Sequence, residues 1–200
     1  LDTGAPADRS VEALNELATT CTEICEGQAL DVDFEGRSDV RTEEYLEMIE
    51  YKTAVLYAAA AAIPAILLGC DAETIDELHG YGLDIGRAFQ IQDDLLDLTT
   101  PSEDLGKQRG SDLVEGKRTM ITLHARNKGI DTDALVSDDP SEAEIDAAVE
   151  TLRDAGSLDH AREMAQDLVQ QGKARLEVVP HGEPRQLLES IADFLVERGY

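Results

Sequence analysis

The aspartates between Gly86 and Thr100 have the residue type and the spacing to bind a cation. Asp93, Asp94 and Asp97 interrupt a run that is otherwise mostly apolar. On a helix, Asp93 and Asp97 lie one turn apart, with Asp94 on the adjacent flank. Gln90 precedes Asp93 by about one more turn, so all four polar side chains can face one cleft.

Carboxylates at this spacing require a positive charge nearby. Two of them about 6 Å apart repel each other by roughly 3 kcal/mol at an effective dielectric constant of about 20. Oxygen ligands select a hard cation, Mg²⁺ above all when phosphates complete its shell. The alternative is that Asp93, Asp94 and Asp97 form the solvent-facing side of an amphipathic helix. Nearly the same spacing recurs in the turn "SDDPSE" (137–142), which has no apolar helix behind it, so context must separate the two interpretations.

Basic residues supply the complementary charge. The chain has only five lysines: Lys52, Lys107, Lys117, Lys128 and Lys173. Lys107 and Lys117 lie in the glycine-bearing segment 101–119 that follows the aspartates, and Lys52 lies beside Thr53 on a second predicted helix. Because metal and ammonium together neutralise a diphosphate, these residues predict a diphosphate site. The alternative is a helix bundle with one acidic face and one basic loop.

The elements that position these residues are predicted to be helices. Apolar residues recur three or four positions apart almost to the C-terminus, and no alternating strand pattern is present. Capping signals place helix starts at Thr42 and Ser141, and Gly156 closes the second of these helices. The alanine-rich run 53–70 predicts a buried helix kinked at Pro64, whose small residues either leave room for an apolar channel or pack tightly.

These patterns predict an all-α fold with one domain, residues 1–200. We expect a helix bundle around a central cavity, with the helices of Lys52 and Asp93 facing each other across it. The polar, glycine-bearing stretches between the predicted helices are too short to be domain linkers.

Composition limits the partners of this chain. Acidic residues outnumber basic ones by 43 to 17, which gives a formal net charge of −26 and argues against nucleic acid as a partner. An acid-rich, lysine-poor surface is typical of a halophilic protein, the alternative being a merely acidic mesophilic one. Three cysteines form no disulfide framework, and we found no signal peptide or uncharged membrane span. We therefore expect a cytoplasmic protein without stable membrane insertion.

Three sequence runs resemble one protein family. In order and spacing, "YLEMIEYKTA", "YGLDIGRAFQIQDDLLDL" and "LGKQRGSDLVEGKRT" are similar to the second half of the trans-prenyltransferases, the isoprenyl (polyprenyl) diphosphate synthases such as geranylgeranyl diphosphate synthase. The resemblance extends from about Asp8 to the C-terminus and includes "CEGQALD". The pattern from Gly106 to Thr119 argues against related terpene-cyclising enzymes.

The resemblance implies a role for each of these residues. The implied metal ligands are Asp93, Asp94 and Asp97, the implied diphosphate contacts are Lys52, Lys107 and Lys117, and the residues implied near the allylic cation are Thr53 and Gln90. Of these, Lys52, Thr53, Gln90 and Lys107 would carry catalysis. Metal and lysines would stabilise the charge on the leaving diphosphate of an allylic substrate while its C–O bond ionises. Isopentenyl diphosphate would then add head-to-tail and lose a proton, giving farnesyl or geranylgeranyl diphosphate.

The sequence departs from the family upstream. The family's first aspartate-rich motif and the arginines that follow it have no match here. We therefore expect the chain to be the C-terminal part of a synthase, inactive by itself, and the resemblance implies a homodimer. The alternative is a noncatalytic helical subunit or remnant, which the retained acids and lysines disfavour.

Overall fold

The computed structural model describes residues 4–35, 37–101 and 109–197, and these residues form helices without a strand. The prediction of an all-α fold is confirmed. The helices are α1 (Ala7–Glu35), α2 (Thr42–Ile49), the π-helix η1 (Glu50–Ala54), α3 (Val55–Leu68), α4 (Ala72–Thr99), α6 (Ser111–Val114), α7 (Met120–Asn127), the 3₁₀-helix η2 (Thr132–Ala134), α8 (Glu142–Asp154), α9 (Ser157–Arg175), the 3₁₀-helix η3 (Leu176–Val178) and α10 (Glu183–Glu197).

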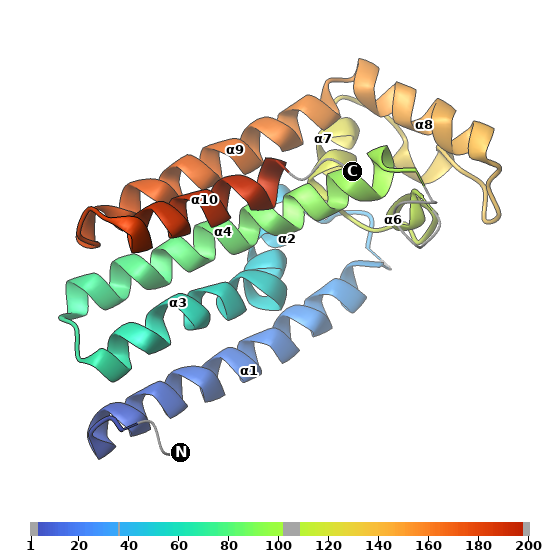
Figure 1. Ribbon diagram of the computed structural model, residues 1–200. Helices are drawn as coiled ribbons and strands as arrows, with labels where there is room; N and C mark the ends of the chain where they lie inside the picture. Colours follow the sequence, from blue (N-terminus) through green and yellow to red (C-terminus); the bar gives the residue numbers. More distant parts are fainter. Residues whose placement is uncertain (1–3, 36, 102–108, 198–200) are drawn as a thin grey trace.

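The long helices lie side by side, and α4 is the central one (Figure 1). It packs most extensively against α9 on one side and α3 on the other, while α1 packs against α3 and η1. The short helices α6, α7 and α8 gather at the end of the bundle where α4 finishes. That end carries the aspartates of α4.

Local capping explains where several helices begin and end. At α4, the Asp71 carboxylate accepts a 2.8 Å hydrogen bond from the Thr74 N–H. Ser141 and Glu144 form the predicted capping box of α8, and Gly156 follows that helix with a φ of 71°. The predicted cap at Thr42 is wrong by one residue, because α2 already includes Thr42 and its N-cap is Arg41.

The segment from α2 through η1 to α3 is one helical path whose regularity is broken by a π-turn. The sequence predicted an irregularity at Pro64, which lies inside α3, but not the π-turn at Glu50–Ala54.

By length and composition alone, Thr42–Leu68 is the one helical segment within the described residues that could cross a membrane. It contains several acids and packs between α1 and α4, which favours a core helix.

The alanines of α3 serve tight packing against α4. Ala58, Ala59 and Ala62 are buried. A Cβ on Gly82 of α4 would lie 2.4 Å from the Ala58 Cα, so the two backbones approach as closely as glycine allows. Tight packing therefore accounts for Ala58, Ala59 and Ala62, whereas Ala60 is exposed and Ala61 is half-buried.

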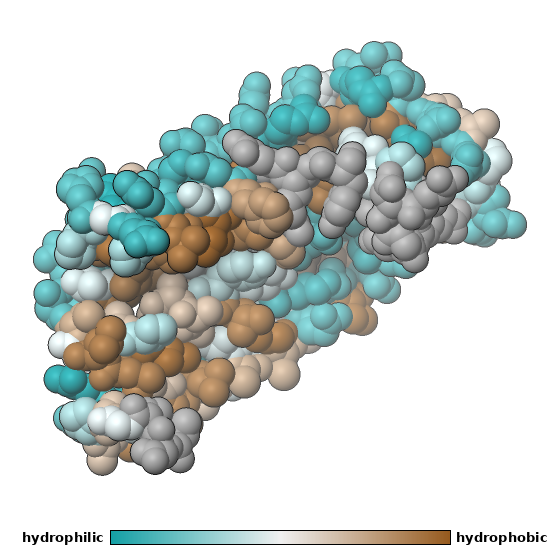
Figure 2. All heavy atoms as spheres, viewed as in Figure 1, coloured by the Kyte–Doolittle hydropathy of each residue, from teal (hydrophilic) through white to brown (hydrophobic). Residues whose placement is uncertain are grey.

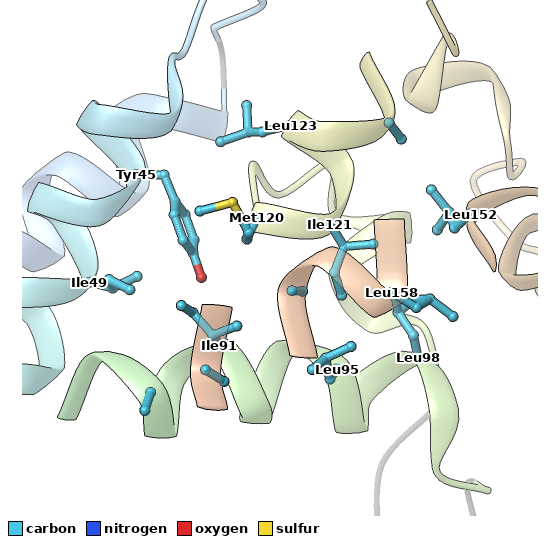
Figure 3. Close-up of a cluster of buried hydrophobic side chains, with 14 of the residues drawn as sticks. Tyr45, Ile49, Ile91, Leu95, Leu98, Met120, Ile121, Leu123, Leu152 and Leu158 are labelled. Atoms are coloured by element: carbon cyan, nitrogen blue, oxygen red, sulfur yellow. The ribbon is translucent and has the colours of Figure 1, made fainter. Parts of the chain in front are cut away.

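The hydrophobic core extends to the end of the bundle that holds the aspartates. Tyr45 of α2 packs near Met120 of α7, and its hydroxyl group points toward α4 (Figure 3). Ile91 of α4 is fully buried in the same cluster. Large apolar side chains also remain exposed, including Leu56 of α3 and Phe194 of α10, and Figure 2 shows hydrophobic surface over α1, α3 and α10.

Candidate active site

A cavity of about 280 Å³ lies between α1, α2, η1, α4 and the turn before α7. Five of the predicted site residues line it: Lys52, Gln90, Asp93, Asp94 and Lys117. The cavity confirms that the helices of Lys52 and Asp93 face each other across a shared space. It combines carboxylates with ammonium groups, as the sequence pattern predicted.

Asp94 is the buried acid of the cavity, whereas Asp93 is exposed. The Tyr45 hydroxyl donates a 2.7 Å hydrogen bond to one Asp94 oxygen, and the Gln90 amide donates a 3.1 Å bond to the other. Burial and the nearby charge of Asp112 raise the pKa of Asp94 to about 7, against the lowering effect of these hydrogen bonds. Burial and Asp94 also raise the pKa of Tyr45, which keeps its hydroxyl a donor.

Lys52 enters the cavity from η1 and is paired with an acid of α1. Its Nζ lies 2.5 Å from Oδ2 of Asp31, and both side chains are partly shielded from solvent. Asp31 also lines the cavity. The ammonium group therefore has a counter-ion while it faces the aspartates of α4.

Thr53 acts on the cavity through Gln90. Its hydroxyl donates a 2.9 Å hydrogen bond to the side-chain Oε1 of Gln90, and the side-chain Nε2 of Gln90 in turn donates to Asp94. Consecutive residues of η1 thus reach two different helices, Lys52 toward α1 and Thr53 toward α4. This relay joins three of the predicted residues in one chain of hydrogen bonds.

Lys117 forms the second ammonium group of the cavity. Its Nζ lies 2.7 Å from Asp112 and 3.0 Å from Glu115. Burial disfavours the charge of Lys117, but the hydrogen bonds to Asp112 and Glu115 outweigh it and raise the pKa of the lysine. Both predicted lysines in the described part of the site are therefore paired with carboxylates.

Asp97 occupies a different position from the other two predicted metal ligands. It is buried, accepting a 2.8 Å bond from the Ser111 hydroxyl and a 3.1 Å bond from the Asp112 N–H. It therefore supports the start of α6 and does not line the cavity. Within the described residues, no group of three or more acids, histidines or cysteines is arranged to hold a metal.

Among the described basic residues of segment 101–119, Lys117 and Arg118 line the cavity, whereas Arg109 does not. The predicted diphosphate contact Lys107 lies outside the described residues. The Arg109 guanidinium donates to the Leu98 carbonyl and lies 2.8 Å from Asp146. Arg118 borders the cavity but is buried, donating to the Arg37 carbonyl and to Asp133.

Sequence reasoning did not assign roles to Asp31, Tyr45 or Asp112. Asp31 ends the run "CEGQALD", and Asp112 lies between two of the predicted lysines, so both belong to motifs already singled out. Tyr45 precedes Lys52 by seven residues, about two helical turns, a spacing that could have indicated a shared face. These signals do not identify the partners of Asp31 and Tyr45, because the Asp31–Lys52 and Tyr45–Asp94 contacts join helices that are distant in sequence.

The chemical type of the cavity's acids suits a hard divalent cation, although no three of the described acids are grouped to hold one as they stand. Asp31, Asp93, Asp94 and Asp112 all contribute carboxylates to its lining, and oxygen-only ligands are what Mg²⁺ prefers. Burial first, and then the charge of Asp112, raise the pKa of Asp94, and a bound cation would offset both effects. Lysines beside these acids complete a site suited to a metal-bound anion.

Fold and cavity together define an all-helical protein whose acids and lysines meet at the end of a central helix. Comparison with known proteins gives this class its family. The family model described as polyprenyl synthetase matches residues 3–152. The chain belongs to this family, the trans-prenyltransferases, as its sequence motifs predicted.

Individual relatives are similar over almost the whole chain. It is 80% identical over 200 residues to a geranylfarnesyl diphosphate synthase of Natronomonas pharaonis, covering 100% of this chain and 59% of that protein. It is 47% identical over 192 residues to a geranylgeranyl diphosphate synthase of Methanosarcina mazei, covering 96% of this chain and 59% of that protein. The chain thus spans about three fifths of the length of these relatives.

Solved structures agree with the fold. The geranylgeranyl pyrophosphate synthetase of Geoglobus acetivorans has a TM-score of 0.89 at 41% identity, covering 97% of this chain and 60% of that one. A polyprenyl synthase of Caulobacter crescentus, described as complexed with calcium and isoprenyl diphosphate, has a TM-score of 0.85 at 35% identity, covering 94% and 59%.

Proposed function

We propose that the protein carrying this chain is a Mg²⁺-dependent prenyltransferase. It would condense isopentenyl diphosphate head-to-tail with an allylic diphosphate to give a short-chain isoprenyl diphosphate. The observation that carries the proposal is the cavity in which Asp93 and Asp94 of α4 face Lys52 of η1 and Lys117. Membership of the polyprenyl synthetase family supports the same reaction class.

The predicted site residues in and beside the cavity each have a role in the proposed reaction. Asp93 and Asp94 would hold Mg²⁺, which when bound supplies charge stabilisation for the leaving diphosphate. Lys52 and Lys117 would bind the diphosphate oxygens, exchanging their present carboxylate partners for the substrate. Gln90, held by Thr53, would orient Asp94 and present its amide near the ionising carbon.

Lys107 and Asp97, two of the predicted site residues, are not among the described residues that line the cavity. Lys107 stays a proposed diphosphate contact from outside the described residues. To become a ligand of a cation in the cavity, Asp97 would have to release Ser111 and the Asp112 N–H. We therefore propose Asp112, which already lines the cavity, as a further acid near the metal.

The names of the relatives support the substrate class. The Caulobacter crescentus protein is described with calcium and isoprenyl diphosphate, a divalent cation and an anion of the proposed kind. The Natronomonas pharaonis relative is named for a geranylfarnesyl product. We further propose that the enzyme is a cytoplasmic homodimer. Residues 1–200 would form a single domain, the C-terminal part of the enzyme, and this part would be inactive by itself.

The test is a comparison of acids in the cavity with an acid outside it. Asp93→Ala and Asp94→Ala should each lower turnover by about a hundredfold or more with the helical fold intact, because metal-assisted charge stabilisation is worth several kcal/mol. Turnover is measured in the protein expressed from its complete coding sequence, with Mg²⁺, farnesyl diphosphate and labelled isopentenyl diphosphate. The control Asp138→Ala, in an exposed loop, should be silent. Near wild-type turnover in both cavity variants would contradict the proposal.

A further inference from the structure

An ion-pair network outside the cavity contacts the π-helix η1. The Arg87 guanidinium of α4 pairs with the Glu50 carboxylate at the start of η1. Arg87 also lies 3.7 Å from Asp84, and Asp84 accepts a 2.8 Å hydrogen bond from Arg175 of α9. None of these four side chains is among the described residues that line the cavity. The network therefore connects α9 and α4 to η1 without reaching the substrate space.

Two glycines let the neighbouring helices touch the backbone of η1. A Cβ on Gly27 of α1 would lie 2.2 Å from the backbone nitrogen of Lys52, and a Cβ on Gly86 of α4 would lie 2.5 Å from the Ala54 Cα. Neither distance is compatible with a side chain, so both sites require glycine. The backbone of η1 is thus enclosed between α1 and α4, and the pair of Glu50 with Arg87 is a side-chain attachment of η1 that lies outside the cavity and does not involve Lys52 or Thr53.

The π-form of η1 decides where two predicted site residues point. π-helices are rare and occur mostly as single turns, frequently at functional sites. The extra residue rotates all that follows by about 100° relative to an uninterrupted α-helix. If η1 relaxed to an α-helix, Lys52 and Thr53 would change direction together and lose Asp31 and Gln90 as partners.

We infer that Arg87, together with Glu50, is a positioning residue that holds η1 in its π-form and so orients Lys52 and Thr53 for catalysis. Its chemical consequence rests on the proposed function, whereas the persistence of η1 does not. The guanidinium acts through the helix backbone and needs no contact with either substrate. Asp84, which accepts a hydrogen bond from Arg175 of α9, lies 3.7 Å from the other terminal nitrogen of the guanidinium, so the contact to Glu50 is linked to both α4 and α9.

The first measurement is amide hydrogen exchange of residues 51–55 in the protein expressed from its complete coding sequence. Arg87→Met should speed exchange there by about tenfold or more, while Arg87→Lys keeps a cation and stays near the wild type. Lys173→Met is the matched control: the Lys173 side chain is 25% exposed, as against 27% for Arg87, and its partner Asp193 belongs to α10, which packs against α4 and α9. It should leave residues 51–55 unchanged.

The second measurement is steady-state prenyl transfer. In Arg87→Met, kcat should fall by roughly tenfold to a hundredfold with a smaller change in KM, since misplacing reacting groups by about 1 Å has effects of this size. Glu50→Gln should reproduce the loss, and the double variant should be no worse than either single one. Glu50→Gln also serves if Arg87→Met fails to fold.

The outcomes separate the inference from the proposed function. Unchanged exchange at residues 51–55 together with unchanged kcat in Arg87→Met and Glu50→Gln would overturn the role of Arg87. A purely structural role would lower Tm as much as Lys173→Met does and leave kcat alone, which also overturns it. If the unaltered protein shows no prenyl transfer, the proposed function fails, and the exchange comparison by itself decides whether Arg87 holds η1.

Discussion

At the scale of single residues, the Asp94 carboxylate depends on the two side chains that donate to it. Tyr45 and Gln90 each bind a different oxygen of the carboxylate, so its plane is fixed. Because Tyr45 is itself buried against Met120, its hydroxyl has little freedom to move (Figure 3). The orientation of a proposed metal ligand is thus set by the hydrophobic core.

Tyr45→Phe should weaken the response of the enzyme to Mg²⁺ without unfolding it. The ring keeps its packing, but Asp94 loses a hydrogen bond of the kind that contributes about 1.5–3 kcal/mol when a charged group is involved. We expect the Mg²⁺ concentration for half-maximal prenyl transfer to rise by roughly tenfold. Tyr81→Phe is the control, since its hydroxyl donates to the Leu188 carbonyl away from the cavity. Equal Mg²⁺ dependence in both variants would refute this role.

Asp97→Ala should act on stability. It removes the acceptor of the Ser111 hydroxyl and of the Asp112 N–H, which would leave two polar groups unsatisfied. The free energy of unfolding in urea should fall by about 2 kcal/mol, compared with no change for Asp138→Ala. The opposite pattern, an unchanged midpoint with an altered Mg²⁺ requirement, would show that Asp97 is a ligand as the sequence predicted.

At the scale of elements, helix starts can be tested in pairs. Ser141→Ala removes the side-chain acceptor of the Glu144 N–H at α8 and should cost about 1 kcal/mol of unfolding free energy. Thr42→Ala should cost much less, because α2 is capped from Arg41, whose N–H donates to Glu44. Urea denaturation of both variants measures the difference. A larger loss for Thr42→Ala would restore it as the cap.

The contact of α1 with η1 can be tested by adding one methyl group. Gly27→Ala places a Cβ where the Lys52 backbone lies, so α1 must shift, at a cost of about 1–3 kcal/mol. Gly182→Ala is the matched control, because the nearest atom to its Cβ is 3.7 Å away. Thermal unfolding of the two variants decides the point. Equal Tm values would mean that α1 adapts without strain.

Local signals in the sequence predicted the helices and some of their limits. The cap at Ser141 and the terminating Gly156 follow from residues adjacent in sequence, and periodicity alone predicted the all-α fold. The π-turn at Glu50–Ala54 was not predictable, because it depends on backbone contacts with Gly27 and with α4. The position of Asp97 likewise depends on its hydrogen bonds with Ser111 and Asp112 of α6.

At the scale of the whole molecule, charge dominates. A formal net charge of −26 on 200 residues produces self-repulsion that salt screens. The Debye length falls from about 10 Å at 0.1 M to about 3 Å at 1 M. We therefore expect Tm to rise as KCl increases from 0.1 M to molar concentrations. A Tm that stays flat or falls over this range would contradict the halophilic interpretation.

The ion pairs formed by the two lysines of the cavity affect which ions can bind there. Lys52 is paired with Asp31 and Lys117 with Asp112, so each cation already has an internal counter-ion. An anion that bound both lysines by itself would leave the carboxylates of Asp31 and Asp112 without a counter-ion. A cation that bound these carboxylates by itself would leave the two lysine ammonium groups without one. A metal–diphosphate complex would avoid both costs, because the metal would pair with the carboxylates while the diphosphate would pair with the ammonium groups. Under the proposed function, these closed ion pairs would disfavour binding of a lone chloride ion and favour binding of metal and diphosphate together.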